Sequence, residues 1–376
     1  MNTVIWARQV WEQIDAKLEQ VAVRSAGKHP YTTDEKGVHD DKQDTDITWW
    51  TNGFWPGLLW MMYGATEKPV YRTAAETAQA NLRKAFAEYN GLHHDVGFMW
   101  HISSGVQYRL TGDRRARLDA MYAASLLAAR YNADGGYIRA WNDNGDGVDN
   151  RGWAIIDCMM NIPLLYWASA EKNDPRFASI ARRHADKTLQ YHLRPDGSAR
   201  HIVEYDPADG SFVREYGGQG WGEGSSWSRG QAWALYGFTL SWLYTKDIRY
   251  LDAAKRCAQY FIACVCDDWL PRCDFRAPAS PVIYDSTAGA IAACGLLELA
   301  ACLGEAEGAP YRHAAVHLLR AMEEKFCDWD LSTDAILGMG TERYHSEQGR
   351  HIPIIYGDYF FVEAIAKLTG HWTRSW

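Results

Sequence analysis

Two carboxyl side chains lie in sequence contexts that suit acid–base chemistry. Asp95 directly follows His93 and His94, and Asp157 is embedded in the apolar run of residues 154–160. Burial among apolar groups disfavours a charged carboxylate and raises its pKa, as does a second carboxylate nearby. A carboxylic acid of this kind can donate a proton near neutral pH. On position alone, however, each Asp could instead cap a helix N-terminus, where Asp is common.

The His93-His94-Asp95 cluster also contains the residue types of a metal site. Adjacent side chains are expected to point apart, and the chain has no H-x-x-x-H spacing. We therefore expect no metal there. The segment of residues 142–147 imitates the first half of a calcium loop, but its twelfth position is Trp153 instead of Glu. A polar surface loop is the better interpretation.

A glycine-rich segment from Gln219 to Trp233 combines Arg229 with Trp227 and other indoles. Glycine lets a ligand approach the backbone, arginine offers a fork for a carboxylate, and tryptophan offers a flat face. The Lys-Ser/Thr pair of a phosphate-binding loop is missing, so phosphate binding is not indicated. The alternative is that Arg229 only stacks on its own Trp neighbours.

The composition is consistent with a sugar-binding protein and excludes other classes. The 376 residues include 18 Trp, and the net charge is −8. An excess of indoles is typical of proteins that bind sugar rings, although a Trp-rich core would also explain it. No basic run exists, so we expect no nucleic acid partner. Two carboxylates, Trp and Arg together indicate chemistry on an acidic sugar.

Two kinds of helix alternate along the chain and must position these residues. Six segments are apolar nearly all round, which predicts burial on every side. They begin near Asn52, Asp95, Asp157, Arg229, Asp285 and Asp358. Five amphipathic segments follow them in turn, beginning near Pro69, Gly112, Asp174, Asp247 and Pro310, and residues 4–21 supply a sixth. This pattern predicts an all-α (α/α)6 toroid formed as one domain by residues 1–376, in preference to an open helical solenoid.

The remaining bulk features indicate a cytoplasmic protein. No apolar stretch is long enough to span a membrane, and the first residues have acidic and basic interruptions that a signal peptide lacks. The eight Cys contain no C-x-x-C pair and are expected to be reduced. The sequence leaves open whether the protein is a monomer or a dimer.

At these residues the sequence resembles the unsaturated glucuronyl hydrolases of glycoside hydrolase family 88. The resemblance extends through essentially the whole chain and includes residues 50–60, 93–98, 155–167, 227–233, 284–291 and 356–360. It implies an (α/α)6 barrel that needs no metal or organic cofactor. The implied substrate is a small acidic oligosaccharide, made by a polysaccharide lyase, whose non-reducing end is a Δ4,5-unsaturated uronate.

The resemblance also implies roles for individual residues. Asp157 is the expected acid–base and Asp95 the second essential carboxylate. The implied substrate contacts are His94, His201, Gln219 and Arg229 at the uronate, Trp50, Trp141, Trp227 and Trp233 as aromatic walls, and Tyr344 near the next sugar. Asn52 departs from the acidic residue that family members often carry. Ser346 and Arg350 either bind a sulfate group or face solvent.

The implied reaction is hydration of the C4=C5 double bond by Asp157, followed by loss of the remaining saccharide. Three alternatives stay open at this point. They are an unsaturated rhamnogalacturonyl hydrolase acting on pectin fragments, an (α/α)6 sugar 2-epimerase and a glycan-binding toroid without activity. The His93-His94-Asp95 motif and residues 226–233 favour the glucuronyl group.

Overall fold

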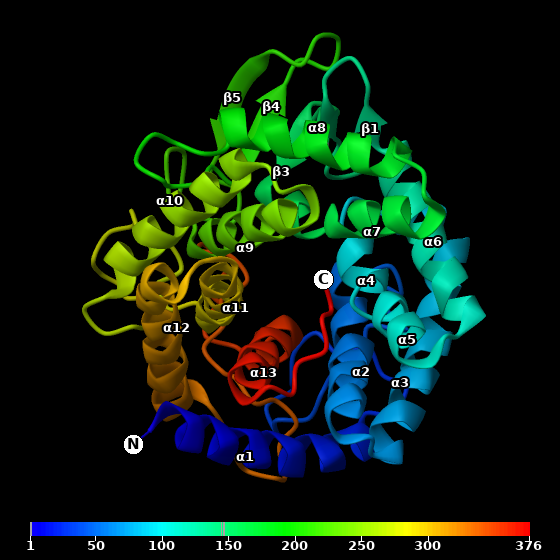
Figure 1. The fold of residues 1–376 in the computed structure, drawn as a ribbon, viewed down its shortest axis with the longest axis vertical. Coiled ribbons are helices and arrows are strands. Elements are labelled where there is room, and N and C mark those ends of the chain that lie inside the picture. The colour runs from blue at the N-terminus through cyan, green and yellow to red at the C-terminus, as the bar shows by residue number, and fades with distance from the viewer. Residues whose placement is uncertain (1, 144, 146) are drawn as a thin grey trace.

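The computed structural model describes residues 2–143, 145 and 147–376; Asn144 and Asp146, in the calcium-like loop, lie outside the described residues. Helices in two concentric layers form a ring (Figure 1). The inner helices are α2 (Phe54–Thr66), α4 (Val96–Trp100) with α5 (Ser104–Thr111), α7 (Pro163–Lys172), α9 (Ser228–Thr245), α11 (Ser286–Cys302) and α13 (Ile355–Thr369). The outer helices are α1 (Thr3–Arg24), α3 (Pro69–Leu82), α6 (Arg114–Ala129), α8 (Arg176–Tyr191), α10 (Ile248–Val265) and α12 (Glu305–Phe326). The predicted (α/α)6 toroid is confirmed.

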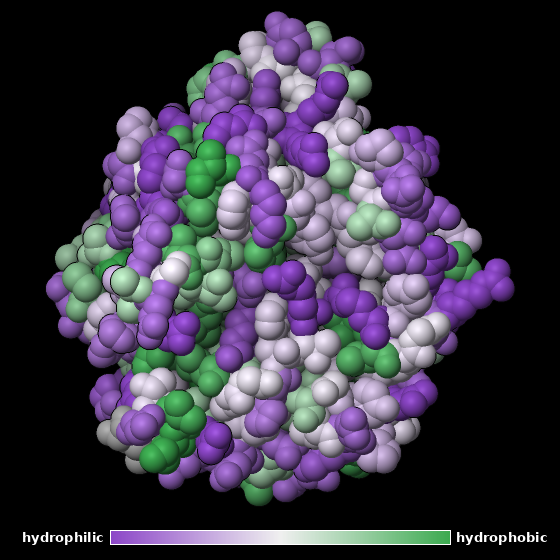
Figure 2. Space-filling model, viewed as in Figure 1, coloured by the Kyte–Doolittle hydropathy of each residue, from purple (hydrophilic) through white to green (hydrophobic). Residues whose placement is uncertain are grey.

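The side chains explain which helices lie inside. Every residue of α11 from Ser286 to Ala300 is buried, whereas α12 buries only one face and exposes charged residues on the other. A helix without a polar stripe must be covered on all sides. Amphipathic helices provide that cover, and hydrophilic residues accordingly occupy most of the face shown in Figure 2.

Two inner helices are interrupted near the candidate carboxylates. Between α4 and α5, the Ser103 hydroxyl donates a 2.5 Å hydrogen bond to the Met99 carbonyl. Ahead of α7, residues Ile156–Met160 form a 3₁₀ turn, η4, and Pro163 is the first residue of α7 itself. Proline has no N–H to continue the earlier turn into the helix. Asp157 therefore lies on η4 and not at the start of a long helix, which the periodicity did not predict.

A small antiparallel sheet leads the chain into η4. Strand β3 (Trp153–Ile155) pairs with β4 (Ile202–Tyr205), which pairs with β5 (Phe212–Tyr216). The register sets Ile155 opposite Ile202, and the Ile156 N–H donates to the His201 carbonyl at 3.0 Å. The sheet thus places His201 beside Asp157. A shorter hairpin is formed by β1 (Tyr131–Asn132) and β2 (Tyr137–Ile138).

Buried charged groups pack together at the end of the ring that lies away from the small sheet and η4. Trp376 lies inside the ring (Figure 1), where its ring stacks on Phe360 and its indole N–H donates to Glu363 at 2.9 Å. Lys367 pairs with Glu298 at 2.7 Å and with Glu363 at 3.1 Å. These groups lie along the C-terminal half of α13, so the opposite end of the ring is the one that carries the inner-helix N-termini.

A buried lysine, Lys17, binds α1 to a loop that is distant in the sequence. The Lys17 ammonium has no exposed surface and donates to the carbonyls of Asp328 and Asp330, both at 2.8 Å, and to the Thr333 hydroxyl at 2.9 Å. This arrangement satisfies all three ammonium hydrogens. Among the described residues, no helix combines the length and apolar character required to cross a bilayer.

Candidate active site

The carboxylates near the inner-helix N-termini divide into two groups. Asp285 accepts the backbone N–H groups of Thr287 and Thr341, each at 3.2 Å, and thereby caps α11. Asp358 accepts the N–H groups of Ile336 and Leu337 at 3.0 and 2.7 Å. Asp285 Oδ1 accepts these backbone bonds while its Oδ2 pairs with Arg229, and both oxygens of Asp358 accept from the backbone. The capping interpretation therefore holds for Asp285, and Asp358 has a structural role.

Asp95 and Asp157 use their oxygens differently. Asp95 stands at the N-terminus of α4 but makes no side-chain capping bond. One oxygen of Asp157, Oδ1, is buried and lacks a hydrogen-bond partner within the described chain. A buried polar atom without a partner is costly and calls for an explanation. A hydrogen-bond donor on a bound ligand would satisfy this oxygen.

The imidazole rings of His93 and His94, which precede Asp95, both lie close to one oxygen of its carboxylate, Oδ2. His93 Nδ1 and His94 Nε2 each lie 3.4 Å from Asp95 Oδ2. The expectation that the two neighbouring histidines point apart was therefore wrong, and the ligand atoms of the three residues lie within 4.8 Å of one another. Burial lowers the pKa of His93 to about 3 and that of His94 well below its ordinary value. Both rings are thus neutral at physiological pH, and they act as polar neighbours of Asp95 rather than as cations.

Asn161 connects the two carboxylate segments and was missed by the sequence reasoning. Its Nδ2 donates to Asp95 Oδ1 at 2.9 Å and to the Asp157 carbonyl at 3.2 Å. Its Oδ1 accepts the Phe98 N–H at 2.8 Å. Gly97 packs so closely that a Cβ there would lie 2.6 Å from this amide. The signal available in the sequence was a polar residue four positions after Asp157 in an otherwise apolar run.

The two carboxyl groups have raised pKa values. Burial raises the pKa of Asp157 to about 7, and the positive charge of Arg229 opposes this. Burial, then the charge of Asp157, raises the pKa of Asp95 well above its ordinary value, with the Asn161 hydrogen bond opposing. Two carboxylates in one buried site resist ionising together. The pair therefore holds a proton near neutral pH.

Arg229 is extensively bonded within the protein. Its Nη1 donates to Asp285 Oδ2 at 2.5 Å and to the Thr341 carbonyl at 2.7 Å, and its Nη2 donates to the Glu342 carbonyl at 2.7 Å. The guanidinium also lies 4.5 Å from the Trp227 ring, as the stacking alternative predicted. These contacts engage Nη1 fully, so a substrate contact would use Nε or the second Nη2 hydrogen.

The four predicted tryptophan walls are not equally accessible. Trp50 and Trp141 are partly exposed, and Trp50 packs against Tyr356 with ring centroids 5.1 Å apart. Trp227 is buried against the His201 ring at 4.1 Å, and Trp233 is fully buried between Phe98 and Phe360.

Unsatisfied polar atoms gather among the predicted site residues. Within the described residues, the indole N–H groups of Trp227 and Trp233 have no hydrogen-bond partner, and neither do His94 Nδ1 and His201 Nε2. Direct contacts connect these side chains: His201 contacts Trp227, and Phe98 joins Trp50 to Trp233. Together with Asp157 Oδ1, they form a set of buried groups that a polar ligand would satisfy.

Gln219 and Tyr344 are placed together at the rim. The Gln219 backbone N–H lies 3.0 Å from His201 Nδ1, and its carbonyl accepts the Tyr344 N–H at 2.9 Å. Arg350 donates twice to the Tyr344 carbonyl, at 2.5 and 2.8 Å. Arg350 therefore supports Tyr344 instead of simply facing solvent. The Ser346 hydroxyl accepts the Gly349 N–H at 3.3 Å within the same loop.

The departure at Asn52 has a structural explanation. Asn52 is fully buried, and its Nδ2 donates to the carbonyls of Asp46 and Ile47 at 3.1 and 3.0 Å. A carboxylate could not donate these two bonds. The amide at this position therefore holds the loop that leads into η1 (Trp50–Gly53), where Trp50 is located.

Comparison with known proteins identifies the family. The model of Glycosyl Hydrolase Family 88 matches residues 21–245. The chain is 36% identical to the unsaturated glucuronyl hydrolase of Bacillus sp. strain GL1, over 96% of this chain and 99% of that protein. The chain belongs to glycosyl hydrolase family 88.

Other members of family 88 extend this result. The chain is 32% identical to the unsaturated chondroitin disaccharide hydrolase of Streptococcus pneumoniae, over 88% of this chain and 84% of the relative. Its fold matches the crystal structure of the Bacillus sp. GL1 unsaturated glucuronyl hydrolase with a TM-score of 0.89 and 35% identity, covering 95% and 96% of the two chains. The protein is accordingly a glycoside hydrolase, and the (α/α)6 fold is that of its family.

Proposed function

We propose that the protein releases a Δ4,5-unsaturated uronate from the non-reducing end of lyase-generated oligosaccharides, with glycosaminoglycan-type disaccharides among its substrates. The observation that carries the proposal is the Asp157 carboxyl group. It has one buried oxygen without a partner and a pKa near 7, and it lies beside a second carboxyl group in a family 88 fold. Similarity to an unsaturated glucuronyl hydrolase and to an unsaturated chondroitin disaccharide hydrolase supports it.

Hydration of the double bond accounts for the chemistry. Protonated Asp157 gives its proton to C4, and positive charge develops at C5 and the ring oxygen. The Asp157 carboxylate then takes a proton from water as the water oxygen bonds to C5. The resulting hemiketal opens to a ketone at C5, and the remaining saccharide leaves from C1. The rule that relates carboxylate separation to stereochemistry at C1 does not apply, because C1 is not attacked.

A single residue that serves as acid and then as base needs a pKa close to the working pH. The pKa of about 7 at Asp157 meets this requirement. Burial and the charge of Asp157 raise the pKa of Asp95 too, but an ionised Asp95 is the form that would keep the neighbouring proton on Asp157 and stabilise the cationic transition state. The Asn161 hydrogen bond favours this ionised form of Asp95.

The remaining predicted residues suit binding of the sugar acid. Trp50 and Trp141 offer accessible ring faces for stacking. The unpartnered nitrogens of His94, His201, Trp227 and Trp233 offer hydrogen bonds. Gln219 and the free positions of Arg229 would contact the uronate carboxylate, and Tyr344 would contact the following sugar. No metal or organic cofactor is required by these roles.

We further infer that residues 1–376 act as one catalytic domain in the cytoplasm, as a monomer or a dimer. Each of the eight Cys, all within the described chain, is a free thiol. Unpaired thiols in this number are consistent with a reducing compartment.

The decisive assay follows the absorbance of the conjugated double bond. Unsaturated chondroitin, hyaluronan, heparin and xanthan-type fragments should lose absorbance at rates that rank the substrates, and Asp157→Asn should abolish the loss. Faster turnover of unsaturated pectin fragments would favour a rhamnogalacturonyl hydrolase. Constant absorbance with every fragment, while the wild-type protein still binds them, would refute hydrolysis. Full activity of Asp157→Asn would refute the assignment of the acid.

A further inference from the structure

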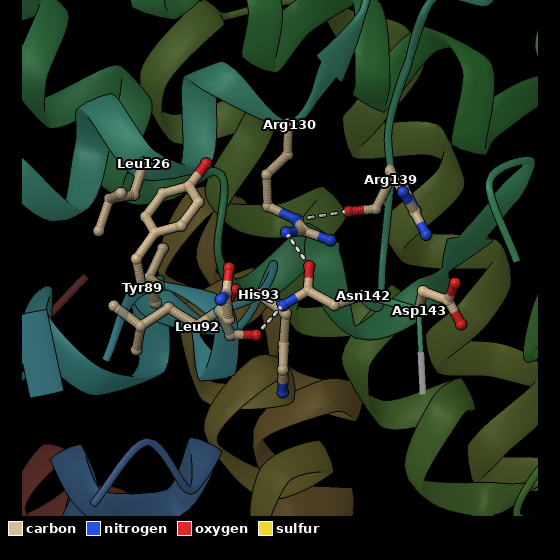
Figure 3. Close-up of a pocket in the computed structure, with 10 residues that line it drawn as sticks. Tyr89, Leu92, His93, Leu126, Arg130, Arg139, Asn142 and Asp143 are labelled. Atoms are coloured by element: carbon tan, nitrogen blue, oxygen red, sulfur yellow. Dashed lines mark hydrogen bonds between the residues drawn. The ribbon is translucent and has the colours of Figure 1, made fainter. Parts of the chain in front are cut away.

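A polar cavity lies next to the candidate active site, on the side of His93. It has a volume of about 420 Å³ and is bordered by η3 (Tyr89–Gly91), the C-terminal end of α6 and residues 139–143 (Figure 3). One of its walls is His93, whose Nδ1 lies 3.4 Å from Asp95 Oδ2. The cavity therefore adjoins the catalytic pair at His93, and the proposed function does not use it.

Arg130 is fixed at this cavity by neutral acceptors. Its Nε donates to the Arg139 carbonyl at 2.9 Å, its Nη1 to Asn142 Oδ1 at 2.7 Å and its Nη2 to the Ala140 carbonyl at 2.9 Å. Asn142 is itself held by donation to the Asn90 and Leu92 carbonyls. The guanidinium is thus rigidly placed, and two of its five N–H groups stay available.

Arg139 brings a second positive charge to the same space. Its Nη2 donates to Asn150 Oδ1 at 2.5 Å, whereas its Nε is buried without a partner in the described structure. Burial, then the charge of Arg139, lowers the pKa of Arg130 to about 10. Partly buried like charges are unfavourable unless an opposite charge compensates them.

Among the described residues, the acidic groups nearest these arginines form no ion pair with them: Asp95 acts on Arg130, and Asp149 on Arg139, only at longer range. Within residues 2–143, 145 and 147–376, neither Arg130 nor Arg139 forms an ion pair, although Arg117, Arg194 and Arg229 all do. Asp143 also lines the cavity, but its Oδ1 accepts the Gly145 N–H at 2.9 Å instead.

We infer that this cavity binds a small oxyanion group, a carboxylate or a sulfate, between Arg139 and Arg130. Guanidinium groups match the planar and tetrahedral oxygens of these anions with paired, charge-assisted hydrogen bonds. The two available N–H groups of Arg130 would gain acceptors. A volume in the range of small-molecule sites also admits the sugar ring that carries such a group. The source is either a free inorganic anion or an acidic monosaccharide.

Calorimetric titration of three variants tests this inference. Inorganic sulfate, glucuronate and neutral glucose are titrated into wild type, Arg139→Gln and Arg151→Gln. Arg151 is a matched control because it is exposed and already paired with Asp149 at 2.7 Å. We expect Arg139→Gln to weaken binding of at least one anion tenfold or more, Arg151→Gln to change nothing, and glucose not to bind. Binding of both anions identifies the oxyanion as sufficient, and binding of glucuronate alone identifies an acidic sugar.

Equal anion affinity in wild type and Arg139→Gln would overturn the inference, as would the absence of anion binding to wild type. Crystals soaked in selenate locate the anion directly: an anomalous peak beside Arg139 is required, and a peak found only elsewhere contradicts the site. Turnover of unsaturated disaccharides is measured separately in buffer free of these anions. That assay tests the proposed function alone, so the two failures are distinguishable.

Discussion

The substitution Asp157→Asn should remove activity and at the same time make the fold more stable at alkaline pH. The pKa of Asp157 is about 7 in the folded protein and near 3.8 for an ordinary carboxyl group. Between those values the unfolded chain gives up its proton while the folded chain keeps it. Stability contributed at this position is therefore lost as the pH rises from about 4 to 7, and the loss is complete above 7.

The magnitude follows from the size of the shift. A difference of about three pKa units corresponds to about 4 kcal/mol, which is a ceiling. Since part of the Asp157 side chain meets solvent, water screens this cost, and we expect Asp157→Asn to gain about 1–3 kcal/mol at pH 8. At pH 4.5 the gain should shrink to about a quarter, because the folded group is still protonated and the pH is only about 0.7 units above the pKa of the unfolded group.

Urea titrations at pH 8 and pH 4.5 measure this gain, and Asp358→Asn is its matched control. Burial raises the pKa of Asp358 to about 7 as well, but both its oxygens accept backbone N–H groups. An amide there would direct its NH2 at one of these donors, so Asp358→Asn should not be stabilised. The reasoning is refuted if Asp157→Asn is less stable than wild type at pH 8, or if its gain is undiminished at pH 4.5.

Three further outcomes follow from the same structure. The kcat for an unsaturated disaccharide should fall about tenfold per pH unit above pH 7, as Asp157 loses its proton; a rate independent of pH up to 9 would contradict the acid role. Asn161→Ala removes a hydrogen bond worth about 1.5–3 kcal/mol from Asp95, so kcat and its pH profile should both change. Met159→Ala is the control, because Met159 is buried on the same turn; it should lower stability and leave the pH profile of kcat unchanged. Identical pH profiles for Asn161→Ala and Met159→Ala would exclude a role for Asn161 in positioning Asp95. Lys17→Met should cost about 2–4 kcal/mol in urea titrations while the KM of the folded enzyme stays at its wild-type value, since the three charge-assisted bonds that are lost involve no predicted substrate contact.

The architecture could be predicted because it depends on local sequence patterns. A helix buried on all sides, such as α11, has an apolar sequence, and a helix buried on one face, such as α12, has an amphipathic one. The alternation of these two patterns along the chain predicted the two layers of helices. The apolar context of Asp157 likewise indicated a raised pKa before any coordinates. The interruption by η4 was not seen, although Pro163 marks it, because the apolar run continues across the break.

The contacts within the site depended on partners distant in sequence. Arg229 was expected to offer a free fork, but Asp285 and the carbonyls of residues 341 and 342 occupy much of it. Asn161 reaches back 66 positions to Asp95, and no local pattern specifies that bond. Residue type and periodicity describe a side chain's own surroundings, whereas these roles are set by which loops meet at the end of the ring.

Closure of the ring has a consequence for synthesis of the chain. Helix α1 is made long before α13, which it contacts, and Ile14 and Val21 on α1 are fully buried. Translation at about 5–20 residues per second separates the two helices by about 17–66 s over about 330 residues. During that interval α1 can pack on α3, which is made soon after it, but the part of its apolar face that α13 covers stays without its partner. The nascent chain should therefore depend on holding chaperones at the ribosome more than an open helical array, whose neighbours emerge in succession.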